Sequence, residues 1–246
     1  MPTVAGFDAR VVPLDLWRAV EAQHRVSTMV LVDTLDEQAL LERILDDSKP
    51  SLESAPRSLH YLLFTPFRYP PLPNGSRFRG PFDPGVFYGA EAIRTACAEL
   101  GYWRWRLLND SPQLQSIPPV PQTLFRTAVS GRTIDLRVPP LSRRRKQWTD
   151  PDDYSACQKL ARDARAEGIQ VIRYQSVRDP QAGGCAAVLS HTAFTSPTPA
   201  ENQSWTLAVF RQRVFWRRDS IFEVESFEFD AGQWTTPATQ PPSAQQ

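Results

Sequence analysis

The sequence "TDPDDYSACQKLARDARAEGIQVIRYQSVRD", residues 149–179, contains the clearest helix of the chain, followed directly by a strand. A cap at Thr149 or Asp150 precedes the first turn of the helix, which holds Pro151. Gly168 marks its end. Its apolar face is formed by Tyr154, Cys157, Leu160, Ala161 and Ala164. Because residues 169–179 follow as a strand, the domain is expected to mix both kinds of element.

Further helices and strands are predicted on both sides of this stretch. We expect strands at 59–69 and 85–90, a helix at 91–108, and more strands within 185–191 and 205–229. Residues 123–138 are read as a hairpin that turns at Ser130–Gly131. Since strands and helices follow each other without a regular alternation, the expected fold class is α+β.

The first 58 residues are predicted to form a helical extension of the main domain. In the segment 34–50, Thr34 and Glu37 match a capping box at the start of a helix. An earlier helix is expected around "LDLWRAVEAQHRV", residues 14–26. The main domain is then placed at 59–234, and the polar, proline-rich residues 235–246 are expected to form a flexible tail.

Composition excludes several classes of function. The chain has 246 residues, and 28 Lys and Arg against 27 Asp and Glu give a net charge of +1. That balance lacks the basic surplus of a nucleic-acid-binding protein, so we expect no direct nucleic-acid partner. No apolar run has membrane-spanning length, and Asp8 and Arg10 stand where a signal peptide is apolar. Three cysteines without CxxC spacing and three scattered histidines favour buried thiols, a cytoplasmic location and no metal site.

The candidate chemistry rests on arginine, tyrosine, glutamate and serine, because the motifs of phosphate loops, zinc proteases and serine hydrolases are absent. That set suits a phosphate-bearing substrate whose reaction develops positive charge. Arg68 and Arg77 could clamp a pyrophosphate, since guanidinium groups fork onto phosphate oxygens. Tyr88 could orient a ring or a ribose, and Glu99 could stabilise an oxocarbenium-like centre. Taken singly, each residue also fits an ordinary structural role, as helical glutamates are mostly solvated.

Several other polar and aromatic residues are given structural roles. Glu91 is interpreted as a charge at the start of a helix. The basic run Arg143–Lys146 is interpreted as a solvated loop, and Trp103 as a packing residue. Arg79 receives no role.

Three blocks of sequence, taken in order, resemble the RES domain family, which is named for its arginine, glutamate and serine. The first is "FRYPPLPNGSRF" (67–78), the second "GVFYGAEAIRTACAE" (85–99), and the third "DYSACQKLARDARAEGIQVIRYQSVRD" (153–179). Ser76-Arg77-Phe78 stands where the family usually has Gly-Arg-Trp. Arg77 and Tyr88 are 11 residues apart, and Tyr88 and Glu99 are again 11 apart.

The resemblance implies a fold related to ADP-ribosyltransferases, with a mixed β-sheet core flanked by helices, and a site that consumes NAD. It assigns catalytic roles to Arg68, Glu99 and Ser176. The residues expected to bind NAD are Arg68, Tyr69, Arg77, Tyr88, Glu99 and Ser176. NAD is the substrate in this interpretation, and no resident cofactor is implied.

The family further implies cleavage of the nicotinamide–ribose bond by the toxin of a toxin–antitoxin module, with an Xre-like antitoxin protein as partner. The acceptor can be inorganic phosphate, water or a protein side chain. A protein ADP-ribosyltransferase with the same pocket, and a catalytically inactive RES-like binding domain, remain as alternatives. The oligomeric state is left open.

Overall fold

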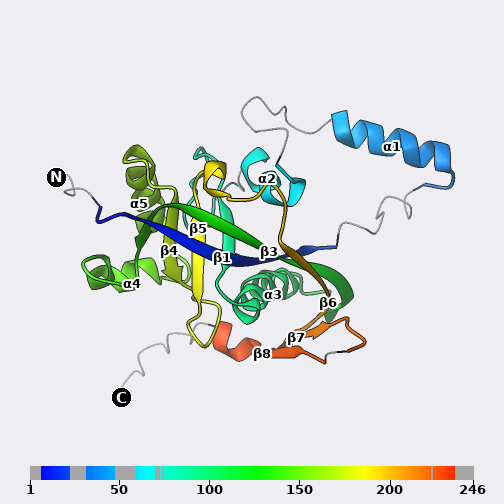
Figure 1. The fold of residues 1–246 in the computed structure, drawn as a ribbon. Helices are drawn as coiled ribbons and strands as arrows, with labels where there is room; N and C mark the ends of the chain where they lie inside the picture. Colours follow the sequence, from blue (N-terminus) through cyan, green and yellow to red (C-terminus); the bar gives the residue numbers. More distant parts are fainter. Residues whose placement is uncertain are drawn as a thin grey trace, which may run out of the picture.

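The computed structural model describes residues 7–22, 32–47, 59–69, 73, 75–222 and 224–235. Helices and strands are mixed within it, which confirms the α+β class (Figure 1). The strands are β1 (Arg10–Glu21), β2 (Phe87–Ala90), β3 (Ser116–Asp135), β4 (Val171–Gln175), β5 (Gly184–Val188), β6 (Glu201–Phe210), β7 (Arg213–Arg218) and β8 (Ser226–Asp230). The α-helices are α1 (Leu35–Asp47), α2 (Tyr61–Arg68), α3 (Ile93–Asn109), α4 (Arg145–Trp148) and α5 (Ser155–Ala166).

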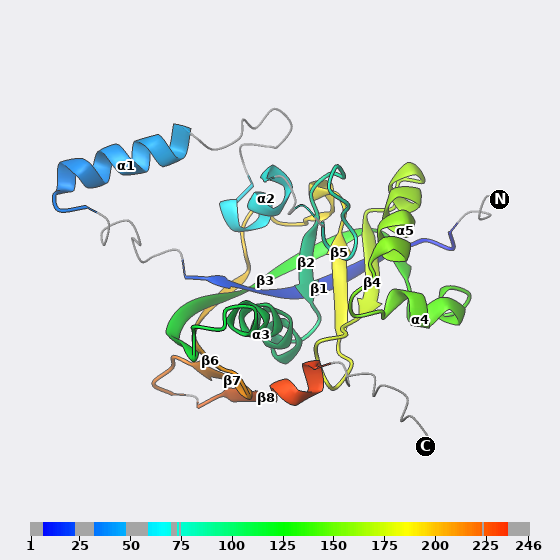
Figure 2. The same ribbon diagram turned by 180° about the vertical axis from the view of Figure 1, so that it is seen from behind.

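The sheet has eight strands in the order β1-β2-β5-β4-β3-β6-β7-β8, and β1 also pairs with β3. Because β1 pairs with both β2 and β3, the first five strands of this order form a closed ring. The β3–β4 pair is parallel, and the other pairs are antiparallel. Both views show α3 between the β1–β3 pair and the β6–β8 extension, and α3 contacts β1 and β6 (Figures 1 and 2).

The predicted helix at residues 14–26 is wrong, because residues 10–21 form strand β1. Apolar side chains at Leu14, Leu16 and Val20 also fit a two-residue period, and Leu16 is fully buried among Phe87 and Phe125. Long-range pairing with β3 along the whole of β1 therefore overrides the local helical pattern. Residues 10–21 are therefore an integral strand of the sheet and not part of a helical extension.

The second predicted helix of this region is present as α1. Its capping box is also confirmed: the Glu37 backbone amide donates to Thr34 Oγ1 at 3.2 Å, and the Thr34 amide donates to Glu37 Oε2 at 3.2 Å.

The predicted strand at 59–69 is also wrong, because residues 61–68 form helix α2. Its short apolar run fits either element by period, and burial of Leu62, Leu63 and Phe64 against the sheet favours the helix. Likewise, Ser130–Gly131 lies inside the continuous strand β3 rather than in a hairpin turn. A Cβ at Gly131 would meet Gln170 Oε1 at 2.7 Å, so this glycine allows a close approach and does not mark a turn.

The remaining predicted elements are present as β2, α3, α5, β4, β5 and the strands β6–β8. The predicted start of α5 is wrong, because the helix begins at Ser155 with Tyr154 at its N-cap position, so Thr149, Asp150 and Pro151 precede it. Cys97, Cys157 and Cys185 are buried free thiols, as expected. Among the described residues, no helix is long and apolar enough to cross a membrane. The predicted tail, apart from Thr235, lies outside the part of the chain that the structure describes.

Candidate functional site

A cavity of about 370 Å³ opens where β1, β2 and α3 meet the segment after β4. Four residues of α3, namely Ala96, Glu99, Leu100 and Trp103, line it as one helical stripe. Tyr88 reaches it from β2, Arg77 from the turn before β2, and Arg18 from β1. The cavity therefore brings together residues from segments that are far apart in sequence.

Glu99 is the one carboxylate among the described residues that line this cavity. Ser176 Oγ donates a hydrogen bond to Glu99 Oε1 at 2.6 Å. The same Oγ accepts from the backbone amides of Arg178 at 3.1 Å and Asp179 at 3.0 Å. Because both of those partners are donors, the hydroxyl hydrogen of Ser176 must point at Glu99. Ser176 thus fixes one oxygen of the carboxylate and leaves the other for a ligand.

Burial raises the pKa of Glu99 above its ordinary value, and this effect exceeds the opposing ones. The hydrogen bond from Ser176 lowers that pKa, as do the positive charges of Arg77 and Arg178. The buried carboxyl group is therefore costly to ionise. A positively charged ligand beside it would favour the ionised form.

The segment that carries Ser176 is anchored to α3 through Asp179. Asp179 accepts from Arg94 Nη1 at 2.7 Å and from Thr95 Oγ1 at 2.8 Å. Gly183 lies so close to this anchor that a Cβ there would overlap Thr95 Oγ1. Since Arg94 and Thr95 belong to the same helix as Glu99, the glutamate and the serine are held by one rigid unit.

Three arginines line the cavity together with this carboxylate, and each donates to a backbone carbonyl and lies over an aromatic ring. Arg77 Nη1 donates to the carbonyls of Trp148 at 3.0 Å and Asp150 at 2.8 Å, and its guanidinium lies 4.6 Å from the Tyr154 ring. Arg178 Nη2 donates to the Pro151 carbonyl at 2.6 Å. With three cations against one carboxylate, the cavity suits an anionic ligand.

Arg18 is the third of these arginines. Its Nη1 donates to the Tyr88 carbonyl at 3.0 Å, and its guanidinium lies 4.9 Å from the Phe87 ring centroid. Burial lowers the pKa of Arg18 to about 10, so the group is still charged at neutral pH. No carboxylate of the described chain forms an ion pair with Arg18, and its charge is available to an anion.

The hydroxyl of Tyr88 is engaged by the protein itself. It is hydrogen-bonded to Ser76 Oγ at 2.8 Å and accepts from the Phe78 amide at 2.9 Å. Burial raises the pKa of Tyr88, which keeps the phenol neutral. The ring of Tyr88, rather than its hydroxyl, is therefore the part that is free to contact a ligand.

Four of the six predicted site residues come together here: Arg77, Tyr88 and Glu99 line the cavity, and Ser176 lies directly behind Glu99. Arg68 and Tyr69 do not line it. They end α2, with the Arg68 guanidinium 5.9 Å from the Tyr69 ring centroid. Tyr69 lines a second cavity of about 340 Å³, whose wall also includes Arg18 and Arg79.

Sequence reasoning missed Arg18, Tyr154 and Arg178. The sequence signal for Arg18 is its place inside the apolar run "LWRAV". Arginine is rarely buried, so an arginine within an apolar segment indicates a specific role for its charge. Trp103 was assigned to packing, but it is 47% exposed and lines the cavity. Among the described residues, no group of three His, Cys, Asp or Glu side chains could hold a metal ion.

Comparison with known proteins finds a match to one family and a similarity to a solved structure. The model of the RES domain family matches residues 51–210, which is more than half of the chain. No curated protein sequence matches. A chain in the crystal structure of the M. tuberculosis MbcT–MbcA toxin–antitoxin complex is similar at 14% identity, with a TM-score of 0.47. The similarity covers 79% of this chain and 85% of that one.

Proposed function

The chain belongs to the RES domain family, and we propose that it is an NAD-consuming enzyme that cleaves the bond between nicotinamide and ribose. The observation that carries the proposal is the position of Glu99. It is the single carboxylate of a cavity that also presents Arg18, Arg77 and Arg178, within the part of the chain that the structure describes. A dinucleotide that carries anionic phosphates and whose reacting ribose carbon becomes cationic matches that distribution of charge.

The arginines would hold the phosphates of NAD. Guanidinium groups bind phosphate oxygens through paired hydrogen bonds, and these three are already oriented by the protein. Arg18 takes the part that the sequence pattern assigned to Arg68, because Arg18 lines the cavity and Arg68 does not. The rings of Tyr88 and Tyr154 supply apolar faces for the nicotinamide and its ribose.

Glu99 would stabilise the positive charge that develops as the bond breaks. Nicotinamide leaves with the electron pair of the bond, so its ring becomes neutral and the ribose carbon becomes electron-poor. An ionised carboxylate beside that carbon stabilises the transition state more than the bound substrate, and it therefore lowers the barrier. Ser176 would keep this carboxylate oriented. An oxygen of phosphate, or of water that loses a proton to solvent, would then bond to the ribose carbon and complete the reaction.

The test is nicotinamide release from NAD by the purified protein, with and without inorganic phosphate. Release that needs phosphate and yields phosphorylated ADP-ribose identifies a phosphorylase, and release without it yields ADP-ribose and identifies a glycohydrolase. Label retained on protein identifies the transferase alternative. If no nicotinamide appears under any of these conditions, the proposed reaction is wrong.

We also propose that the chain is the toxin of a toxin–antitoxin module, as the RES resemblance implies. Depletion of NAD would arrest growth, and an Xre-like antitoxin protein would prevent it. Expression of the chain and of its Glu99→Gln variant in bacteria tests this, with cellular NAD and growth as readouts. Arrest by both variants alike would contradict a role of NAD cleavage in toxicity.

A further inference from the structure

The second cavity lies beside the first and shares Arg18 with it. It has a volume of about 340 Å³ against about 370 Å³ for the first. Its wall is built from β1, from α2 and from the turn that precedes β2, with Tyr61, Thr65, Tyr69 and Arg79 among its residues. Because one guanidinium borders both spaces, a single ligand can contact Arg18 from either cavity.

The chemistry of this second wall is aromatic and cationic. Tyr61 is 51% exposed and Tyr69 is 38% exposed, and both line this cavity, so each ring has surface that a ligand can contact. Arg79 Nη2 donates to the Tyr69 carbonyl at 2.8 Å, and its Nε donates to the Asp83 carbonyl at 3.2 Å. No acidic residue of the described chain lines this cavity. Its surface therefore suits a flat ring that carries negative charge.

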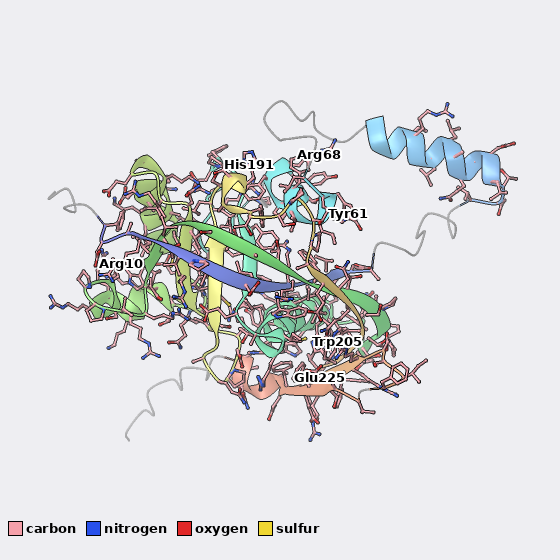
Figure 3. All side chains as sticks on the ribbon, in the orientation of Figure 1. Arg10, Tyr61, Arg68, His191, Trp205 and Glu225 are labelled. Atoms are coloured by element: carbon pink, nitrogen blue, oxygen red, sulfur yellow. The ribbon has the colours of Figure 1, made fainter. Side chains whose placement is uncertain are left out.

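The positions of the two tyrosines follow from α2. Figure 3 places Tyr61 and Arg68 toward opposite ends of this helix, and Tyr69 directly follows its last residue. Buried Leu62 and Val86 also line the cavity and supply its apolar floor. An aromatic base can lie against such a floor while its phosphates extend toward Arg18.

We propose that the second cavity binds the adenosine half of the dinucleotide, with the phosphate of that half on Arg18 and Arg79. The inference rests on the proposed function, under which the first cavity holds the nicotinamide mononucleotide half with its phosphate near Arg77 and Arg178. Arg18 then lies at the pyrophosphate, between the two halves. Tyr69, which does not line the first cavity, thereby becomes a residue that contacts the adenine or its ribose.

The kinetic test compares NAD with nicotinamide mononucleotide, which contains the same reacting bond and lacks the adenosine half. Tyr61→Ala and Tyr69→Ala should each raise the KM for NAD about tenfold, as expected for loss of one stacking contact. The kcat for NAD and the KM for nicotinamide mononucleotide should not change. Equal changes with both substrates, or no change with either, would overturn the inference.

A binding test separates this inference from the proposed function. Calorimetry with ADP as the probe should show binding to the unmodified protein and to Glu99→Gln, and binding about tenfold weaker in the two tyrosine variants. Thr65→Trp, at an exposed position of α2 that lines the cavity, should fill the cavity and remove ADP binding. It removes no buried side chain, although the hydrogen bond from Thr65 Oγ1 to the Tyr61 carbonyl at 2.7 Å is lost. Phe222→Ala is the matched control, because this ring is 95% exposed and lines neither cavity.

The two failures are distinguishable. If NAD releases no nicotinamide but ADP binds and Thr65→Trp abolishes that binding, the reaction is wrong and the adenosine site stands. If NAD is cleaved and ADP binds Thr65→Trp as well as the unmodified protein, the adenosine site is wrong and the reaction stands.

Discussion

Two glutamates only eight residues apart, Glu91 and Glu99, occupy opposite kinds of environment. Glu91 precedes α3 on the outer surface, where Arg173 Nη2 donates to its Oε1 at 2.8 Å and Arg137 Nη1 to its Oε2 at 3.2 Å. Burial alone would raise the pKa of Glu91, but these hydrogen bonds outweigh it and lower that pKa. Glu99, two turns into the same helix, has a raised pKa, and its Oε1 accepts from the neutral groups Ser176 Oγ at 2.6 Å and Cys185 Sγ at 3.9 Å.

The difference lies in what each carboxylate has available for a ligand. The surface cluster balances Glu91 and Asp135 against Arg137 and Arg173, so its charges are neutralised within the protein. The cavity leaves three arginines and one carboxylate without such mutual pairing in the described chain. A group that is kept from its ordinary partners at a cost in stability is the usual mark of a functional site.

The largest expected effect comes from removing each carboxylate in turn. Glu99→Gln should lower kcat for nicotinamide release about 10²–10³-fold, because the transition state loses its nearest negative charge. Glu91→Gln, the matched control, should leave kcat unchanged. Single-turnover assays with NAD measure both. Equal kcat values for the two variants would contradict the catalytic role that is assigned to Glu99 and not to Glu91.

The next effect concerns the arginines. Arg18→Met keeps the apolar stem of the side chain and removes the charge, and it should raise the KM for NAD about 10–100-fold through loss of a charged hydrogen bond to phosphate. Arg68→Met should change the KM little, since Arg68 lines neither cavity. Initial-rate kinetics on both variants decide between the two arginines. A larger increase in KM for Arg68→Met than for Arg18→Met would instead support Arg68 as the phosphate-binding arginine, as the sequence pattern implied.

A smaller effect is expected in the pH dependence. Ionised Glu99 is the reactive form in this mechanism, so kcat/KM should fall as pH drops through its raised pKa. Ser176→Ala removes a hydrogen bond that lowers this pKa, and the acid limb should therefore move to higher pH. Glu91→Gln should leave the limb in place. A limb that stays fixed in Ser176→Ala would mean that another group titrates.

The smallest effects are on the free energy of unfolding, and they should have opposite signs. The pKa of Glu91 is lowered on folding, so its ion pairs stabilise the protein above the unfolded pKa and this is lost as pH falls through the native pKa. Glu91→Gln should therefore cost up to about 1 kcal/mol at neutral pH and nothing in strong acid.

The pKa of Glu99 is raised, so stability falls as pH rises from the unfolded pKa through the native one. Glu99→Gln should therefore be more stable than the unmodified protein at neutral pH, with no such gain in acid. Urea unfolding at several pH values gives both curves. A loss of stability in Glu99→Gln at neutral pH would contradict the cost assigned to the buried carboxylate.

The part of the site that could be predicted from sequence is local or regularly spaced. Arg77, Tyr88 and Glu99 follow one another at fixed intervals through a turn, a strand and a helix, and the helical period places Glu99 beside Ala96 and Trp103. The strands β4 to β8 and the helices α3 and α5 likewise have clear periods and turn residues. For these elements, local pattern and tertiary packing agree.

The parts that could not be predicted depend on distant partners. The apolar residues of β1 fit both a helical and a strand period, and the choice is made by pairing with β3 more than a hundred residues away. The short run in α2 is ambiguous for the same reason. Arg18 belongs to β1, and Tyr69 follows α2. Because both elements were predicted wrongly, the sequence did not predict that Arg18 lines the first cavity or that β1 and α2 form much of the second.

The closure of the strand ring by β1 has a consequence for solubility. A fragment that begins at residue 51, the first residue of the family match, and keeps the rest of the chain would lack β1 and with it every partner on one side of β3 from Arg10↔Thr133 to Glu21↔Gln122. The exposed backbone of that long strand would be a template for pairing with other copies. We expect such a fragment to aggregate, whereas a fragment that begins before residue 7 should stay dispersed, as light scattering would show.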